Sequence, residues 1–181
     1  LLLSIEHGTY PYVTSSDCSV NGTANGVGLP ATLVDLVLGV LKFPFMTRVG
    51  GGAFPTELGG KTSEEYCRND GIRKETELRL TGVVYHKEGK EIVYDHTDSK
   101  IEEMINSEDA FIQGIGIRLA AEEYGATTTR PRRIGWTDAV AARYARNING
   151  SKNNLKFVLT KPDALAGARN FKIGYSYNHP A

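Results

Sequence analysis

The eleven residues ATTTRPRRIGW, which run from Ala126 to Trp136, place three hydroxyl side chains directly before three arginines. Arginine presents a planar fork of N–H donors that pairs with two oxygens of a carboxylate or a phosphate. The proline between Arg130 and Arg132 stiffens the backbone, so these two guanidinium groups can serve different anions. A solvated basic turn is the alternative, but clustered like charges normally have acids beside them, and the nearest acids, Glu123 and Asp138, lie outside the stretch. We therefore expect an anion-binding loop.

The sequence that follows this loop alternates predicted helices with predicted strands. Thr137 can cap a helix over DAVAARYARNI, which ends at Asn149 and Gly150. Beyond it the pattern predicts a buried strand, a turn that leads into a helix, and a last strand, over LKFVLT, KPDALAGA and FKIGYSY respectively. This alternation indicates an α/β fold in which a mainly parallel central sheet is flanked by helices.

The N-terminal part of the chain shows a similar alternation. We expect a short strand over LLLSI, an extended segment over HGTYPYVTSS and a loop over GTANGVGLP. The run ATLVDLVLGVLKF is apolar on almost every face and follows Pro30, which predicts a buried helix. A strand over FPFMTRV then leads into Gly50, Gly51 and Gly52.

The segment 62–123 differs from its surroundings because it is highly charged. Within it, TGVVYHKEGKEIVYDH alternates on both sides of a KEGK turn, as a β-hairpin does, and FIQGIGIRLAAEEYG is typical of a helix closed by Gly125. We interpret residues 62–123 as an insertion within a single α/β domain that spans residues 1–181.

Composition excludes several classes of function. Basic and acidic residues both number 21, so the overall charge offers no attraction to nucleic acid or to an anionic membrane surface. Cys18 and Cys67 form no CxxC motif, which argues against a disulfide framework or structural zinc and fits the reducing cytoplasm. No apolar run reaches the roughly 18 residues of a membrane span. We expect a cytoplasmic protein without a metal site of its own.

Three further loops carry polar groups or bare backbone. Thr14 and its neighbouring serines follow the first predicted strand and could hold a phosphate, although a capped turn is an equally good interpretation. The glycines after the FPFMTRV strand would let a ligand approach the backbone, but they do not match the phosphate-binding pattern GxxxxGK[ST]. In LTKPD, the Asp163 carboxylate could accept two hydrogen bonds from guanine while Lys161 lies over the base. Taken alone, an ordinary helix start remains the better interpretation of LTKPD.

Four motifs in this order, HGTYPYVTSS, TRVGGGAFPTEL, YGATTTRPRRIGW and LTKPD, together resemble the adenylosuccinate synthetase family. The resemblance covers residues 1–58 and 123–177. It implies the P-loop-NTPase-like α/β fold of that family and the GTP-dependent ligation of IMP and L-aspartate to adenylosuccinate in AMP biosynthesis. It also implies a need for Mg²⁺ and a homodimer.

The same resemblance assigns roles to residues of this chain. Arg130 is implied to reach the nucleotide and the substrate carboxylate, Arg132 to reach GTP, and the Lys161 and Asp163 pair to recognise guanine. Thr14 is assigned to the IMP phosphate, and Val49 and Gly50 are assigned to the IMP ribose. The aspartate loop is assigned Ala126, Thr127, Thr128, Thr129 and Arg130. The GTP site is assigned Arg132, Lys161 and Asp163.

The chain also departs from the family pattern. The family's phosphate-binding loop, its catalytic aspartate, which is a general base and Mg²⁺ ligand, and its catalytic histidine belong to an N-terminal part that is not in this sequence. We therefore expect no catalytic residue and no metal ligand here, a chain truncated at both ends, and no activity without the N-terminal half. Thr129 stands where the family usually has glycine, and the 62–123 segment is longer than its counterpart, with packing, a lid or a subunit contact as its possible roles.

Two alternatives remain open. One is a relative with a changed substrate, such as the enzymes that join aspartate to dGMP, for which Thr129 and the insertion leave room. The other is a non-catalytic nucleotide-binding or assembly module, which the absence of the catalytic half favours. A basic nucleic-acid binder is the least favoured interpretation, because the net charge is zero.

Overall fold

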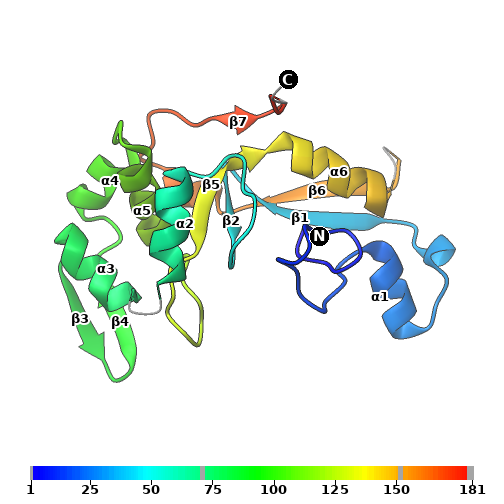
Figure 1. Ribbon diagram of the computed structural model, residues 1–181, viewed down its shortest axis with the longest axis horizontal. Coiled ribbons are helices and arrows are strands. Elements are labelled where there is room, and N and C mark those ends of the chain that lie inside the picture. The colour runs from blue at the N-terminus through cyan, green and yellow to red at the C-terminus, as the bar shows by residue number, and fades with distance from the viewer. Residues whose placement is uncertain (1, 70–71, 151–152, 179–181) are drawn as a thin grey trace.

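The computed structural model describes residues 2–69, 72–150 and 153–178 (Figure 1). Its helices are α1 (Val20–Val27), α2 (Gly60–Arg68), α3 (Lys74–Thr81), α4 (Ser99–Ile105), α5 (Ala110–Ala120) and α6 (Ala139–Asn149), with two short 3-10 helices, η1 (Ala31–Leu33) and η2 (Pro162–Leu165). Its strands are β1 (Val37–Lys42), β2 (Phe45–Arg48), β3 (Tyr85–Glu88), β4 (Glu91–Tyr94), β5 (Arg133–Asp138), β6 (Leu155–Thr160) and β7 (Ile173–Gly174).

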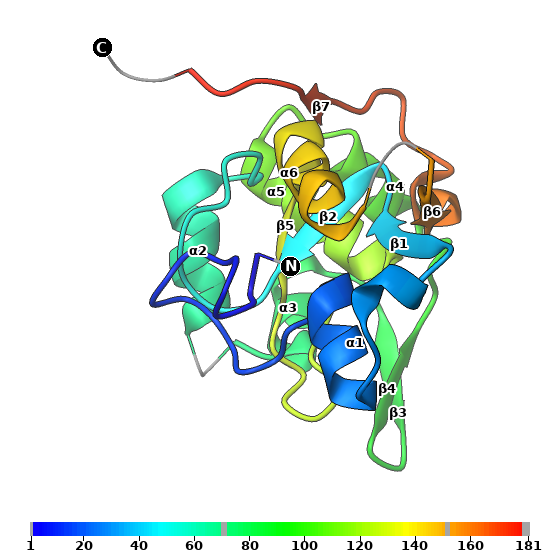
Figure 2. The same cartoon turned by 90° about the vertical axis from the view of Figure 1, so that its right-hand side faces the viewer.

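These elements form a mixed α/β fold with parallel strands flanked by helices, as the sequence predicts. β1 pairs in parallel with β6, and β7 pairs in parallel with β5. β2 pairs with the other edge of β5 in the antiparallel direction, and β3 and β4 form a separate antiparallel hairpin. In Figure 1, β2 and β5 lie between the β1–β6 pair at one end and helices α2 to α5 at the other, and Figure 2 shows the hairpin extending away from both.

Two predictions for the N-terminal part are wrong. The residues of LLLSI that the structure describes form turns with an isolated bridge from Ser4 to Thr14, and Leu1 lies outside the described residues. The predicted loop GTANGVGLP contains most of helix α1. This helix forms because the Ser19 hydroxyl accepts a hydrogen bond from the Gly22 amide at its start, and left-handed Gly28 ends it.

The run ATLVDLVLGVLKF, predicted as a buried helix, forms η1 and then strand β1. Leucine and valine on every face fit a strand as well as a helix, and the pairing of Val37–Lys42 with the distant Leu155–Thr160 favours the strand. At the centre of this pair a side chain on Gly39 would approach the Phe157 ring to 3.1 Å, so glycine permits the contact. The LKFVLT strand is confirmed as β6, but only Leu155 of it is buried.

The later elements agree better with prediction. The TGVVYHKEGKEIVYDH hairpin is confirmed as β3 and β4, and the FIQGIGIRLAAEEYG helix is confirmed as α5, although it ends at Ala120. Helix α6 is also confirmed, but its cap is Asp138 and not Thr137, because the Asp138 carboxylate accepts from two amides of the first turn. The predicted helix in KPDALAGA is the single turn η2, and the last strand shortens to β7.

The hydrophobic core lies where α5 packs against β5 and α4. Its fully buried apolar side chains come from β2, α3, α4, α5 and β5, and they are Phe45, Leu78, Ile101, Ile117, Leu119 and Ile134. A buried ion pair stands beside them: Arg118 Nη2 lies 2.7 Å from Glu77 Oε1, and the Tyr124 hydroxyl donates to the same carboxylate. Glu77 is completely shielded from solvent, so the pair links α3 to α5 in a medium where an unpaired charge is costly.

Replacement of Glu77 by alanine leaves Arg118 as a buried charge without its partner. We expect the Glu77→Ala variant of the full-length protein that contains this sequence to lose about 3–5 kcal/mol of unfolding free energy in urea denaturation. Glu65→Ala is the control, because the Glu65 side chain is 66% exposed and lies 3.8 Å from Lys61; its loss should stay within about 1 kcal/mol. Equal losses in the two variants would contradict this role for Glu77.

Candidate functional site

A cleft of about 340 Å³ opens beside the ATTTRPRRIGW segment, and we call it the arginine cleft. Among the described residues that line it, five are arginines and none is acidic. It unites five of the residues assigned from the sequence, namely Val49, Gly50, Thr128, Arg130 and Arg132, and its lining is completed by Arg48, Cys67, Arg68, Gly125, Pro131 and Arg133. A concave surface of this composition favours ligands with phosphate or carboxylate groups.

Arg133 shapes one wall of the cleft. Its side chain is almost completely buried, and its Nε and Nη2 donate to Glu57 over 2.9 and 2.5 Å. Its Nη1 donates to the carbonyl oxygens of Gly50 and Gly52, both of which have positive φ. A side chain on Gly52 would approach the Arg48 guanidinium to 2.8 Å, so glycine is required there. Sequence reasoning assigned no partner to Arg133 and overlooked Glu57.

Arg48, which sequence reasoning also missed, connects this wall to the HGTYPYVTSS segment. It donates to the Gly51 carbonyl over 3.1 Å and to the Thr9 hydroxyl over 3.0 Å. Burial, followed by repulsion from Arg133, lowers the pKa of its guanidinium from the usual value. Thr14, the residue assigned to the IMP phosphate, is exposed and bonds to the Leu3 carbonyl; it is not part of the cleft lining.

Residues 125–132, which we call the arginine loop, form the opposite wall. The Thr129 amide donates to the Gly125 carbonyl over 2.8 Å, and the Gly125 amide donates to the Arg130 carbonyl over 2.9 Å. Thr129 has a φ of 53°, the left-handed conformation that glycine adopts more easily. Ala126 and Thr127, both assigned to aspartate from the sequence, are exposed and lie outside the cleft lining.

Non-glycine residues with a left-handed backbone conformation lie near the candidate site. Within the described part of the chain, the non-glycine residues with positive φ are Glu122, Thr129 and Lys161. Each such residue costs about 1–2 kcal/mol of backbone strain, which persists only where the surrounding structure enforces it. Thr129 lies in the arginine loop, Lys161 was assigned to guanine, and Glu122 lies beside both segments. The strain is therefore concentrated where sequence reasoning placed the ligands.

The Glu123 carboxylate joins the arginine loop to the LTKPD loop. It is fully buried and lies 2.8 Å from Lys42, 2.8 Å from Arg132 and 3.3 Å from Lys161, a set that we call the Glu123 cluster. Burial alone would raise the pKa of this carboxyl, but hydrogen bonds from Lys42 and Arg132 outweigh it and hold the pKa below its usual value. The carboxylate therefore stays ionised and fixes three cations from three separate segments.

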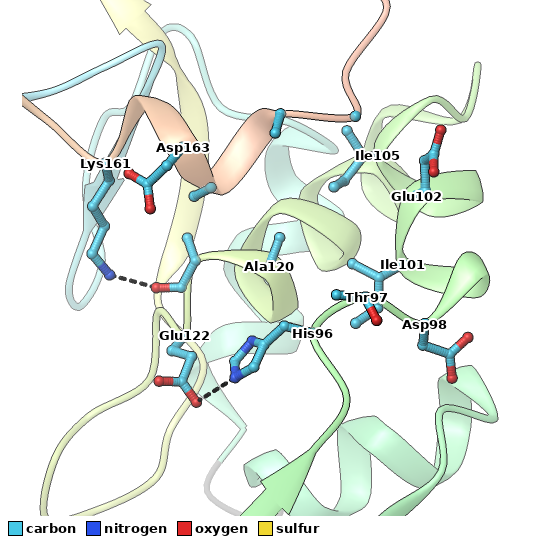
Figure 3. A pocket seen from close by; sticks show the side chains of 14 residues that line it. His96, Thr97, Asp98, Ile101, Glu102, Ile105, Ala120, Glu122, Lys161 and Asp163 are labelled. Atoms are coloured by element: carbon cyan, nitrogen blue, oxygen red, sulfur yellow. Dashed lines mark hydrogen bonds and ion pairs between the residues drawn. The ribbon is translucent and has the colours of Figure 1, made fainter.

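A second cavity, of about 590 Å³, lies on the other side of Lys161, and we call it the acid-rich pocket (Figure 3). Its lining includes Asp163, assigned to guanine from the sequence, and three more carboxylates, Asp98, Glu102 and Glu122. The Lys161 ammonium donates to the Ala121 carbonyl over 2.5 Å. The lining is completed by His96, Thr97, Ile101, Ile105, Ala120, Ala121, Ala164, Ala166 and Gly167.

Carboxylates accept hydrogen bonds and repel phosphates, so the acid-rich pocket suits the N–H groups of a base rather than an anion. His96 and Glu122, which face each other across 3.6 Å in Figure 3, were not predicted as site residues. They belong to the 62–123 segment, for which sequence reasoning offered only packing, a lid or a subunit contact. Only their position next to Asp163 in space identifies them.

Two further searches concern the described residues alone. Among residues 2–69, 72–150 and 153–178, no group of three or more His, Cys, Asp or Glu side chains could hold a metal ion. None of the helices in these ranges combines the length and the apolar character that crossing a membrane requires.

The left-handed conformation of Thr129 predicts a gain on substitution by glycine. We expect Thr129→Gly to raise the unfolding free energy of the full-length protein by about 0.5–1 kcal/mol in urea denaturation, because relief of strain exceeds the entropy cost of glycine. Thr127→Gly, at an exposed position of the same loop without positive φ, should lower stability by about the same amount. A loss in both variants would contradict the strain.

Comparisons with known proteins identify the family. A family model described as adenylosuccinate synthetase matches residues 1–180. The solved structure of fully ligated adenylosuccinate synthetase from Plasmodium falciparum is similar to this chain with a TM-score of 0.55 and 31% sequence identity, and the match covers 92% of this chain and 26% of that one. The chain thus spans about a quarter of the length of this relative. The chain belongs to the adenylosuccinate synthetase family.

Proposed function

We propose that this protein takes part in the GTP-dependent ligation of IMP and L-aspartate, with IMP and aspartate in the arginine cleft and the guanine base of GTP in the acid-rich pocket. The observation that carries the proposal is the arginine cleft itself. Residues assigned from separate motifs, Val49 and Gly50 on one side and Thr128, Arg130 and Arg132 on the other, line one cavity of about 340 Å³.

The charge of the cleft matches these substrates. IMP carries a phosphate and aspartate carries two carboxylates, so their binding needs several cations at close quarters. Arg130 and Arg48 line the cleft together with three other arginines. Such a field would bring together two anionic ligands that repel each other in solution. Backbone at Gly50 lets a ribose approach closely, since no side chain stands in the way.

The acid-rich pocket supports the choice of GTP. Guanine presents an N1–H and an exocyclic amine on one edge, and a single carboxylate can accept both. Asp163 is exposed within the pocket, and Lys161 precedes it with its aliphatic stem beside the same cavity. Adenine has an acceptor at N1, so it would leave the carboxylate unpaired. Arg132 lines the arginine cleft and pairs with Glu123, which links it to Lys161 of the acid-rich pocket. In this position Arg132 could meet the phosphates of GTP.

The proposed chemistry follows from the poor leaving group on IMP. IMP loses its N1 proton, its 6-oxygen takes the γ-phosphoryl group of GTP, and the bond from the γ-phosphorus to the β-phosphate oxygen breaks to leave GDP. The amino group of aspartate then attacks C6, loses a proton, and displaces the oxygen as inorganic phosphate. Both steps spread negative charge, which fixed guanidinium groups stabilise without reorganisation.

The described residues include no group of side chains that could hold Mg²⁺. Mg²⁺, which the family needs, binds several carboxylate or phosphate oxygens that converge on one point and are not already paired with cations. The buried acids near the cleft, Glu57 and Glu123, already pair with cations, and the described residues offer no other cluster that could hold the ion. The residues of this chain therefore bind and orient ligands in our account, and no metal-dependent step is assigned to them.

The test of this function is a ligation assay with the full-length protein that contains this sequence. With GTP and aspartate present, we expect IMP to be converted to adenylosuccinate, which is followed by chromatography. Replacement of IMP by dGMP should give no product. Product from dGMP alone would favour a relative with a changed substrate, and binding of GTP without any product would favour a non-catalytic module; either result would contradict the proposal.

Asp163 provides a test of base recognition. We expect Asp163→Asn to lower kcat/KM for GTP by about a hundredfold or more, because the amide cannot accept both guanine hydrogen bonds. XTP should recover part of this loss, since its 2-oxygen accepts from the new amide. Asp109→Asn, which alters the cap of α5 outside both cavities, is the control and should keep GTP preference. Unchanged use of GTP by Asp163→Asn would show that guanine binds elsewhere.

A further inference from the structure

The arginine loop is held by the start of helix α3 through its main-chain carbonyls. Arg73 Nη1 donates to the Thr128 carbonyl over 2.7 Å, and the Lys74 amide donates to the Thr129 carbonyl over 3.1 Å. Arg73 provides no side-chain cap for α3, so the Thr129 carbonyl satisfies an amide that the helix itself leaves without a partner. Both contacts come from the 62–123 segment, and they meet the loop at left-handed Thr129 and at the residue before it.

Helix α5 holds the other end of the loop. Arg118 Nη1 donates to the Arg132 carbonyl over 2.7 Å, while its Nε and Nη2 are fixed by the buried Glu77 of α3. Helix α2 adds the Arg68 carbonyl, which accepts from Arg130 Nη2 over 3.4 Å. Thus α2, α3 and α5 contact the arginine loop at residues that also line the cleft or adjoin it.

Lys74 extends this support to the acid-rich pocket. Its ammonium group lies 3.2 Å from Glu122, another left-handed residue, and 4.6 Å above the centre of the Tyr94 ring. The Lys74 side chain is only 13% exposed, so its position is fixed by packing. One residue of α3 therefore contacts two left-handed residues: its amide bonds to the Thr129 carbonyl, and its ammonium pairs with the Glu122 carboxylate.

We propose that the 62–123 segment is an insertion that braces the arginine loop in its ligand-binding shape, with Arg73 and Lys74 as positioning residues. The inference rests on the proposed function where it names aspartate as the ligand of the loop. Since Arg73 and Lys74 contact carbonyls, these two residues leave the side chains of Thr128 and Arg130 to the cleft. It also accounts for threonine at position 129, because external hydrogen bonds enforce there a conformation that glycine would otherwise supply.

A braced loop binds its ligand without first losing conformational freedom. If a loop is ordered only part of the time, its apparent affinity falls by that fraction, so removal of a brace weakens binding even though no ligand contact is lost. A residue that merely stabilises the fold would instead change all kinetic constants together. The two roles are therefore separable by experiment.

The test compares Arg73→Ala with Arg79→Ala in the full-length protein. Arg79 lies on the same helix but bonds to Glu75 and Tyr85, away from the loop. Without ligand, we expect amide hydrogen exchange in residues 125–130 to accelerate about three- to tenfold in Arg73→Ala and to stay unchanged in Arg79→Ala. The KM for aspartate should rise by about the same factor in Arg73→Ala, with kcat and the KM for GTP nearly constant.

Arg73→Lys keeps a cationic donor and should restore part of the aspartate KM. Unchanged exchange in the loop of Arg73→Ala would overturn the brace, and so would a uniform loss of kcat and of both affinities together with lower stability. Absence of any aspartate-dependent activity in the unaltered protein would contradict the proposed function instead. In that case the exchange result alone decides the brace: acceleration confined to Arg73→Ala supports it, and equal exchange in the two variants rejects it.

Discussion

The structure depends on one buried charge, the Glu123 carboxylate. An ionised group without solvent is costly unless cations and hydrogen bonds compensate it, so Lys42, Arg132 and Lys161 must converge on this point. These three residues come from β1, from the arginine loop and from the segment that follows β6, which are distant in the sequence. Arg132 lines the arginine cleft and Lys161 lines the acid-rich pocket, so the Glu123 cluster connects the two cavities. In our proposal, these two cavities of opposite charge are neighbouring parts of a single site.

This opposite charge suits the proposed reaction between a purine nucleotide, an amino acid and GTP. Phosphates and carboxylates need guanidinium groups, whereas the edge of guanine needs acceptors, and one cavity could not offer both without neutralising itself. The 62–123 segment contributes to both sides, through Arg68 and the brace on the arginine loop, and through His96 and Glu122 in the acid-rich pocket. In our proposal, the 62–123 segment is therefore part of the site.

The sequence predicted the family and the fold class better than the individual elements of the N-terminal part. Thr128, Arg130 and Arg132, which the motifs singled out, line one cleft, and the KEGK turn located the β3–β4 hairpin because left-handed Gly89 suits such a turn. The ATLVDLVLGVLKF run was misassigned because its apolar residues fit either period, and only pairing with a strand more than one hundred residues away decides between them. For the same reason the sequence could not show that Arg133 pairs with Glu57 across 76 residues, or that Arg118 pairs with Glu77 across 41.

A structure of the full-length protein with IMP, aspartate and GTP bound tests the central claim most directly, namely that the Glu123 cluster holds the two cavities as one site. Our account predicts carboxylate or phosphate oxygens within about 3 Å of the Arg130 guanidinium and the guanine edge within about 3 Å of the Asp163 carboxylate, with the Glu123 pairs intact. Ligands bound on another face of the protein, or a guanine base that avoids Asp163, would contradict it.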